Sequence, residues 1–236
     1  MTELMRCTQK DIESFIERTF ETFERFSSVE AAAVTLAKGM CEEFGSAESS
    51  DLVLSRVFHS FDYELLPPKI QEVAARALGS TPADNSKFLV LIGTHGDKTD
   101  WQQRTSSQGH QAIPLNRNTV TSIPMVARLF QQVGFDLGIV LGEKQTGMDI
   151  SGVYGSYGVF HVPEALGSPF IPAQDFVRDN GVRSVIGTGV MLPEGDIGIY
   201  LAFSRVPVSY DAAKRLSALM PLFWKKIYML REKGMF

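Results

Sequence analysis

The sequence has few cysteines and no long apolar run. Only Cys7 and Cys41 occur among 236 residues, and they form no CxxC pair. This spacing fits neither a zinc site nor a disulfide framework, so we expect two free thiols, with a disulfide between the N-terminal helices as the alternative. No segment has the length of a membrane-spanning helix, and the first residues lack the apolar core of a signal peptide. We therefore expect a soluble, cytoplasmic protein without a membrane partner.

A strong charge of either sign is also absent. The formal net charge is −4, and lysines and arginines are scattered apart from the pair Lys225 and Lys226. No global basic field attracts the chain to nucleic acid, which we do not expect as a partner. Hydrophobic residues make up 44% of the chain and charged residues 21%, a composition typical of a globular protein with a substantial core.

Motifs that carry catalysis are missing as well. The stretches "GTHGD" and "GTG" follow apolar strands but lack the spacing of phosphate-binding loops, and no GxSxG sequence occurs. Glu194 and Asp196 belong to the turn sequence "PEGD", whose exposure to water makes it a poor setting for acid–base catalysis. The four histidines show no metal-ligand spacing. We therefore predict that the protein is not an enzyme and needs no structural metal.

Hydrophobic periodicity predicts the elements that are present. Three-and-four spacing indicates helices, with Ser27 and Glu30 as a capping box before the second one, whereas β-branched and alternating runs indicate strands. The sequence "PEGD" indicates a hairpin turn. The expected helices cover residues 8–26, 29–44, 69–78, 122–137 and 209–233, and the expected strands lie in 52–63, 87–98, 112–115, 151–172 and, as a pair, 182–205.

These elements do not alternate regularly as strand and helix. Such an order predicts an α+β fold with a mostly antiparallel central sheet and helices on one face. No linker, repeat or charge block divides the chain. We therefore expect one domain over residues 51–236, preceded by an N-terminal helical extension over residues 1–50.

The segment "GVRSVIGTGVMLPEGDIGIYLAFSRVPVSYDAAKRLSALMPLFW" resembles the end of a GAF domain, a small-molecule sensor fold of signalling proteins related to PAS domains. In order it has a strand, a glycine-bearing turn, a second strand, an F-S exit and a leucine-lined helix. The stretches "GHQAIPL", "IPMVARLFQQVGFDLG" and "VFHVPEALGSPFIPAQDFV" are similar to GAF domains beside histidine kinase, phosphatase and cyclase modules. The resemblance implies a six-stranded antiparallel sheet with a ligand pocket between one face and the connecting loops.

A polar and aromatic loop supplies the candidate ligand-binding residues. In "DKTDWQQRTSSQGHQ" tryptophan offers an apolar wall, arginine a forked donor for an anion, and serine and histidine orienting groups. For any single residue the alternative is a structural role, such as an ion pair of Arg104 with Asp97 or Asp100. With the later loop and the hairpin, the candidates are Trp101, Arg104, Ser107, His110, Tyr154, Phe160, His161 and Arg183.

These observations together predict a cytoplasmic, small-molecule-binding GAF-like sensor. Because the sequence contains no output module, we expect it to act through ligand-dependent contacts within a dimer or with a signalling protein. Two alternatives stay open. One is a haem-binding gas or redox sensor, since haem needs one axial imidazole and His110 and His161 lie in pocket loops. The other is a scaffolding dimer with a degenerate pocket.

Two apolar stripes suggest how the chain would pair. On the first helix the stripe includes Ile12, Phe15 and Phe20, and on the last helix it includes Phe223 and Ile227. Exposed stripes of this kind are usually buried by two-fold pairing, so we expect a homodimer built on the terminal helices. The alternative is that both stripes fold back onto the domain itself and leave a monomer.

Overall fold

The computed structural model describes residues 3–45, 49–107, 110–144 and 158–236. A single six-stranded sheet runs through this part of the chain, with all neighbouring strands antiparallel and the strand order β3-β2-β1-β6-β5-β4. The strands are β1 (Leu52–Asp62), β2 (Lys87–Gly96), β3 (Ala112–Leu115), β4 (Val159–Val162), β5 (Ser184–Met191) and β6 (Ile197–Ser204). The predicted α+β fold class with an antiparallel central sheet is confirmed.

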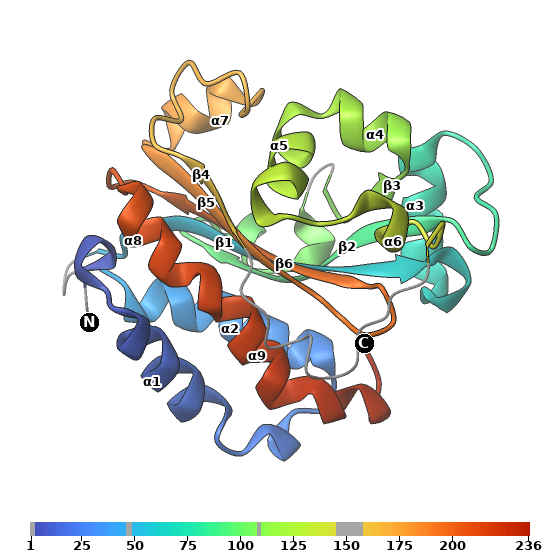
Figure 1. Cartoon of the computed structure of the whole chain (residues 1–236), viewed down its shortest axis with the longest axis horizontal. Helices are drawn as coiled ribbons and strands as arrows, with labels where there is room; N and C mark the ends of the chain where they lie inside the picture. Colours follow the sequence, from blue (N-terminus) through green and yellow to red (C-terminus); the bar gives the residue numbers. More distant parts are fainter. Residues whose placement is uncertain (1–2, 46–48, 108–109, 145–157) are drawn as a thin grey trace.

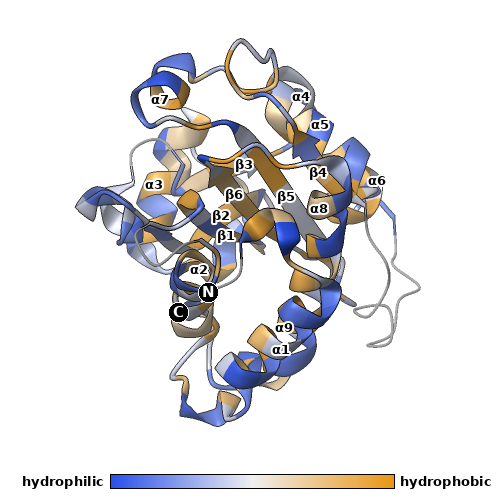
Figure 2. Cartoon of the chain, turned by 90° about the vertical axis from the view of Figure 1, so that its left-hand side faces the viewer, coloured by the Kyte–Doolittle hydropathy of each residue, from blue (hydrophilic) through white to orange (hydrophobic). Residues whose placement is uncertain are grey.

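Three helices cover one face of the sheet, which we call the helical face. They are α1 (Gln9–Phe20), α2 (Val29–Glu43) and α9 (Leu219–Ile227), and α8 (Tyr210–Arg215) leads into the last of them. Figures 1 and 2 show α1 and α9 side by side on this side of the sheet. Phe20 of α1 packs edge-on against Phe223 of α9, with 5.2 Å between ring centroids.

This packing corrects the basis of the homodimer prediction. Ile12, Phe15 and Phe20 on α1, like Phe223 and Ile227 on α9, are buried against one another and the sheet within one chain. The stripes of the two helices cover each other, as in the alternative of folding back onto the domain itself. They therefore leave no apolar stripe exposed for pairing on these helices.

The N-terminal segment shares the core of the sheet. Gly93 of β2 lies so close to α2 that a Cβ atom placed on it would stand 2.4 Å from the carbonyl oxygen of Ala33. Buried apolar residues of α1 and α2 form one cluster with sheet residues such as Val57 and Val90. The described part of this segment contains α1 and α2, which form a layer packed on the sheet.

The other face of the sheet, which we call the cavity face, is covered by connecting segments with short helices. These are α4 (Arg117–Ser122), α5 (Pro124–Val133), α6 (Leu137–Val140) and α7 (Gln174–Asp179), while α3 (Pro68–Leu78) packs beside β3. Figure 1 shows α4, α5 and α7 together on this side. Their apolar side chains form a second core cluster with the sheet residues that alternate with those of the first. The sequence patterns did not predict α4 or α7, which are only six residues long.

Helix ends differ from the predictions for local reasons. The side chain of Ser28, rather than Ser27, caps α2 by accepting a hydrogen bond from the amide of Ala31. The last helix is not continuous, since a 3₁₀ turn at Leu216–Ala218 separates α8 from α9. Pro221 has no N–H to donate to the carbonyl of Ser217, so the α-helical hydrogen-bond pattern cannot continue there.

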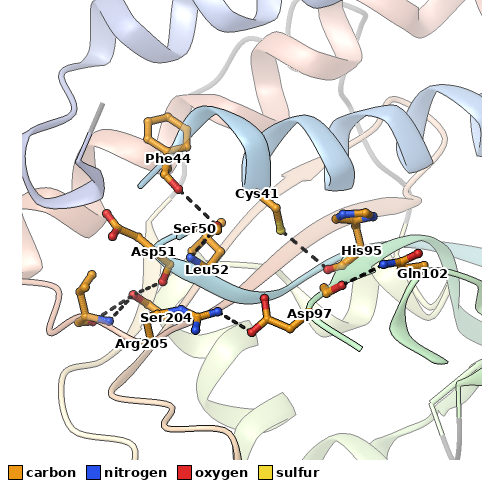
Figure 3. A network of polar contacts seen from close by, with 12 residues as sticks. Cys41, Phe44, Ser50, Asp51, Leu52, His95, Asp97, Gln102, Ser204 and Arg205 are labelled. Atoms are coloured by element: carbon orange, nitrogen blue, oxygen red, sulfur yellow. Dashed lines mark hydrogen bonds and ion pairs between the residues drawn. The ribbon is translucent and has the colours of Figure 1, made fainter. Parts of the chain in front are cut away.

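Polar contacts join the ends of β1, β2 and β6 (Figure 3). The hydroxyl of Ser204 donates to the carbonyl of Asp51 at 3.1 Å, and Arg205 forms an ion pair with Asp97. On the other side of β1, the thiol of Cys41 donates to the carbonyl of His95 at 3.8 Å. Both cysteines are free and buried. No helix in the described part of the chain is long and apolar enough to span a membrane.

Candidate functional site

A cavity of about 590 Å³ lies between the cavity face and the segments that cover it. Four strands supply its floor: β1, β2, β3 and β6. Its walls come from α5, α7 and described residues of the segment between β2 and β3. The lining residues are Leu54, Arg56, Phe58, Leu89, Lys98, Asp100, Trp101, Ser106, His110, Ile113, Ile123, Met125, Val126, Leu129, Phe130, Ile171, Pro172, Ala173, Phe176, Ile199, Leu201 and Phe203.

One side of the cavity is aromatic. The ring of Trp101 meets the ring of Phe176 at 5.6 Å, and Phe176 in turn meets Phe203 of β6 at 5.2 Å, both in edge-on arrangements. These rings come from three segments that are distant in sequence, the loop after β2, α7 and β6. They form an aromatic wall beside the aliphatic residues of β1 and α5.

Arg56 brings a positive charge into this apolar setting. It lies on β1, opposite Thr94 of β2 and Leu201 of β6, and its side chain is partly buried. Its Nη2 donates to the hydroxyl of Ser107 at 3.2 Å, whereas its buried Nε has no hydrogen-bond partner within the described structure. Removal from water lowers the pKa of the Arg56 guanidinium to about 10, so it still carries its charge at neutral pH.

The other polar lining residues stand at the mouth. Lys98, Asp100, Ser106 and His110 are all exposed to solvent. The ammonium group of Lys98 lies 4.9 Å from the centre of the Trp101 ring, where a cation–π contact holds both. Among the described lining residues, Arg56 is therefore the charged group that lies inside the cavity rather than at its mouth.

Hydrogen bonds to β2 fix the segment that carries Trp101. The hydroxyl of Thr94 donates to the carbonyl of Trp101 at 2.9 Å, and the side-chain amide of Gln102 reaches the carbonyl of Gly96 at 3.5 Å (Figure 3). Farther along, the side chain of Gln111 donates to the carbonyl of Ser107 at 2.9 Å. These contacts place the Trp101 ring and the Ser107 hydroxyl over the sheet.

Three of the predicted ligand-binding residues lie at this cavity. Trp101 and His110 line it, one in the aromatic wall and the other at the mouth. Ser107 is buried beside it, and its hydroxyl accepts a hydrogen bond from Arg56, which lines the cavity. The clustering that the loop sequence suggested thus corresponds to one place in the structure for these three.

Arg104 points elsewhere. Its Nε donates to a carboxylate oxygen of Glu30 on α2 at 2.8 Å, and its guanidinium lies 5.7 Å from the ring centre of Phe236. The predicted alternative of an ion pair is correct in kind, but the partner is Glu30 rather than Asp97 or Asp100. Arg104 is consequently not a lining residue of the cavity.

Of the remaining candidates, the three that the structure describes do not line the cavity. Phe160 is fully buried in the core of the cavity face beside Gly187. His161 points to the other side of β4, where its Nε2 lies 2.7 Å from the carbonyl oxygen of Val208. Arg183 is exposed just before β5, and Tyr154 lies outside the described residues. Of the two histidines considered for haem, only His110 is a lining residue.

The sequence patterns missed Arg56 and most of the apolar lining. A signal for Arg56 was present, because Leu54, Arg56 and Phe58 alternate along β1 and so share one face of a central strand. A charged residue inside such a pattern is unusual and marks a candidate site. The aromatic wall left no local signal, because its rings are brought together only by the fold.

The described lining of the cavity contains no cysteine and no cluster of metal-binding side chains. Cys7 and Cys41 are buried on the helical face, where removal from water raises the pKa of Cys7 to about 11 and that of Cys41 to about 12. Within the described residues, no three histidine, cysteine, aspartate or glutamate side chains come together in a way that could hold a metal ion.

Comparison of the sequence with known proteins does not assign the chain to a family. No family model and no curated protein matches the chain. Among solved structures, it is similar to free methionine-R-sulfoxide reductase from Neisseria meningitidis, determined with its substrate, at 15% identity over 97% of this chain and 90% of that one, with a TM-score of 0.49. It is also similar to the chromophore-binding domain of a bacteriophytochrome from R. palustris at 11% identity over 94% of this chain and 62% of that one, with a TM-score of 0.45.

The topology itself gives the class of the fold. Six antiparallel strands, long helices on one face and a cavity under the connecting segments of the other face are the arrangement that the GAF resemblance implied. The fold is GAF-like, with a cavity suited to a small molecule.

Proposed function

We propose that this protein binds a small, mostly apolar molecule in the cavity and responds to it as a ligand sensor. The observation that carries the proposal is the cavity itself, whose volume of about 590 Å³ falls in the range of small-molecule sites. Its lining offers water few hydrogen-bonding groups, so an apolar molecule can occupy it at little desolvation cost.

The response would arise from the walls. Trp101, Leu129 and Phe176 come from three separate segments, which a ligand would contact at the same time. One of these segments, α5, is joined to the edge strand β4 because the side chain of Gln132 accepts a hydrogen bond from the amide of His161 at 3.2 Å. Ligand contacts would thereby stabilise the surface of α5, α7 and β4 that a signalling partner or a second copy of the chain can recognise.

The experiment is a thermal-shift screen of neutral and charged aromatic and aliphatic molecules. Leu129→Trp and Met125→Trp place a bulky ring in the cavity, and Leu166→Trp is the matched control because Leu166 is 56% exposed. We expect ligands that raise the melting temperature of the wild type and of Leu166→Trp but leave the two cavity variants unchanged. Hits that persist in both cavity variants, or a screen without hits, would contradict the proposal.

Two further readouts separate the alternatives. Hydrogen exchange with a hit bound should slow at α5 and α7, and unchanged exchange there would argue against a sensor. Protein prepared with haem should show no stoichiometric Soret band. Such a band, if lost in His110→Ala, would favour the haem-sensor alternative instead.

A further inference from the structure

Arg56 occupies an unusual position for a cation. It lies in the middle of the central strand β1, on the same face as Leu54 and Phe58, and all three line the cavity. Placing a guanidinium beside such apolar neighbours costs free energy unless a counter-charge and hydrogen-bond acceptors compensate it. A hydrophobic residue would fill this position without that cost.

Two other partly buried cations of the chain, Lys87 and Arg104, have carboxylate partners. Lys87 lies 2.9 Å from Asp196 and 3.2 Å from Asp62, and Arg104 lies 2.8 Å from Glu30. For Arg56 the described residues provide one neutral acceptor, the hydroxyl of Ser107, and no carboxylate within ion-pair distance. Lys87 and Arg104 are thus compensated by anions, whereas Arg56, inside the cavity, has no anionic partner among the described residues.

The missing anion has a definable chemistry. A guanidinium has a planar fork of donors that matches a carboxylate in a bidentate arrangement. A single inner positive charge balances a monoanion, and the Lys98 charge at the mouth is accompanied by the opposite charge of Asp100. A phosphate dianion generally needs more donors than one arginine and one hydroxyl, so the arrangement favours a carboxylate.

We propose that the cavity binds an apolar monocarboxylate, whose carboxylate pairs with Arg56 and whose apolar part lies against the aromatic wall of Trp101, Phe176 and Phe203. The hydroxyl of Ser107, held beside the guanidinium, is able to donate to the same carboxylate. This inference rests on the proposed function and adds the charge and shape of the ligand to it.

Calorimetric titration with three probes of one shape tests the inference: 2-naphthoate, neutral 2-naphthamide and 2-naphthyl phosphate. We expect the wild type to bind 2-naphthoate about 10- to 100-fold more tightly than 2-naphthamide, which is the range for hydrogen bonds to a charged group. In Arg56→Met the ratio should fall to near one, whereas Arg183→Met, which removes an exposed arginine outside the cavity, should retain it.

Thermal unfolding of the same proteins separates ligand binding from a structural role of Arg56. We expect Arg56→Met to unfold cooperatively at a melting temperature equal to or above that of the wild type, because an arginine without an anionic partner is removed. A large fall in melting temperature would overturn the inference. Arg56→Lys, which keeps the charge but not the fork, should retain part of the preference for 2-naphthoate.

The remaining outcomes distinguish this inference from the function on which it rests. Equal affinity of the wild type for 2-naphthoate and 2-naphthamide, both blocked by Leu129→Trp, would leave the cavity as a binding site and overturn the carboxylate. A preference for 2-naphthyl phosphate would replace the carboxylate by a phosphate. Failure of all three probes and of the wider screen to bind the folded protein would overturn the proposed function itself.

Discussion

The two faces of the sheet differ in how closely the covering segments pack against them. On the helical face, long helices pack against the sheet and against each other, and the side chains of Phe20, Phe223 and Trp224 are fully buried. On the cavity face, short helices and loops cover the same strands and enclose about 590 Å³. No lining residue of that cavity belongs to the core of the helical face.

The comparison also holds for polar groups. Ser55 and Tyr200 on the helical face satisfy each other through a hydroxyl–hydroxyl hydrogen bond of 3.1 Å, in a site closed to solvent. Arg56, the next residue along β1, faces a cavity with a solvent-exposed mouth. In the proposed account, adjacent positions of one strand thus serve stability on one side and ligand binding on the other. The predictions below test this division.

The largest effect is expected where a charge is forced into the helical face. Ile227→Glu places a carboxylate at a position with 0% exposure and should cost more than about 4 kcal/mol, enough to prevent folding. Met229→Glu, two residues along at 53% exposure, should change the free energy of unfolding by less than about 0.5 kcal/mol. Circular dichroism with urea titration measures both. A folded, dissociated Ile227→Glu would instead restore the stripe as a dimer interface.

Large-to-small substitutions should separate the two faces. Leu36→Ala removes a fully buried side chain on α2 and should cost about 3–5 kcal/mol, because a new void forms in a packed core. Leu129→Ala enlarges a cavity that already exists, loses fewer packing contacts and should cost about 2–3 kcal/mol. Urea unfolding of both variants checks the order, and equal or reversed costs would contradict the account.

A smaller loss is expected where α2 approaches the sheet. Gly93→Ala would place a methyl group 2.4 Å from the carbonyl oxygen of Ala33, so α2 must move and the free energy of unfolding should fall by about 1–3 kcal/mol. The matched variant Ala33→Gly removes a methyl group without adding bulk near β2. A Gly93→Ala protein as stable as the wild type would show that α2 is less closely held than described.

The last effect is a dependence of stability on pH. His59 is buried beside Trp224 with no hydrogen-bond partner for either ring nitrogen within the described structure, and burial lowers its pKa from 6.5 to about 4. Asp196 acts in the opposite direction, while Arg231 and Lys87 lower the pKa further. Between pH 6.5 and 4 the unfolded chain therefore binds a proton that the folded chain does not, and stability falls as the pH falls.

The slope of this loss is at most about 1.4 kcal/mol per pH unit. His59→Phe removes the group while keeping a ring of similar size, so its free energy of unfolding should depend less on pH in that window. Carboxylates titrate in both proteins and cancel in the difference. Parallel curves for wild type and variant, measured by urea unfolding from pH 7 to 4.5, would show that His59 is not the titrating group.

Much of the fold was predictable because its signals are local. Alternation along β1 and β6, the "PEGD" turn and the apolar stripe of α1 depend on neighbours in sequence. The partner of Arg104 was not predictable, since Glu30 lies 74 residues away and is brought near only by the packing of α2 on the sheet. The same limit explains why Trp101 was identified without Phe176, and why Arg56 was missed although its place in an apolar strand was visible.

The most direct test of the division between the two faces is a crystal structure with 6-bromo-2-naphthoate, recorded at the bromine absorption edge. We predict one strong anomalous peak in the cavity between β1 and α5, near Phe58 and Phe176, with the carboxylate at the guanidinium of Arg56. A peak between the sheet and α9, or no peak within the cavity at saturating ligand, would contradict the assignment of binding to the cavity face.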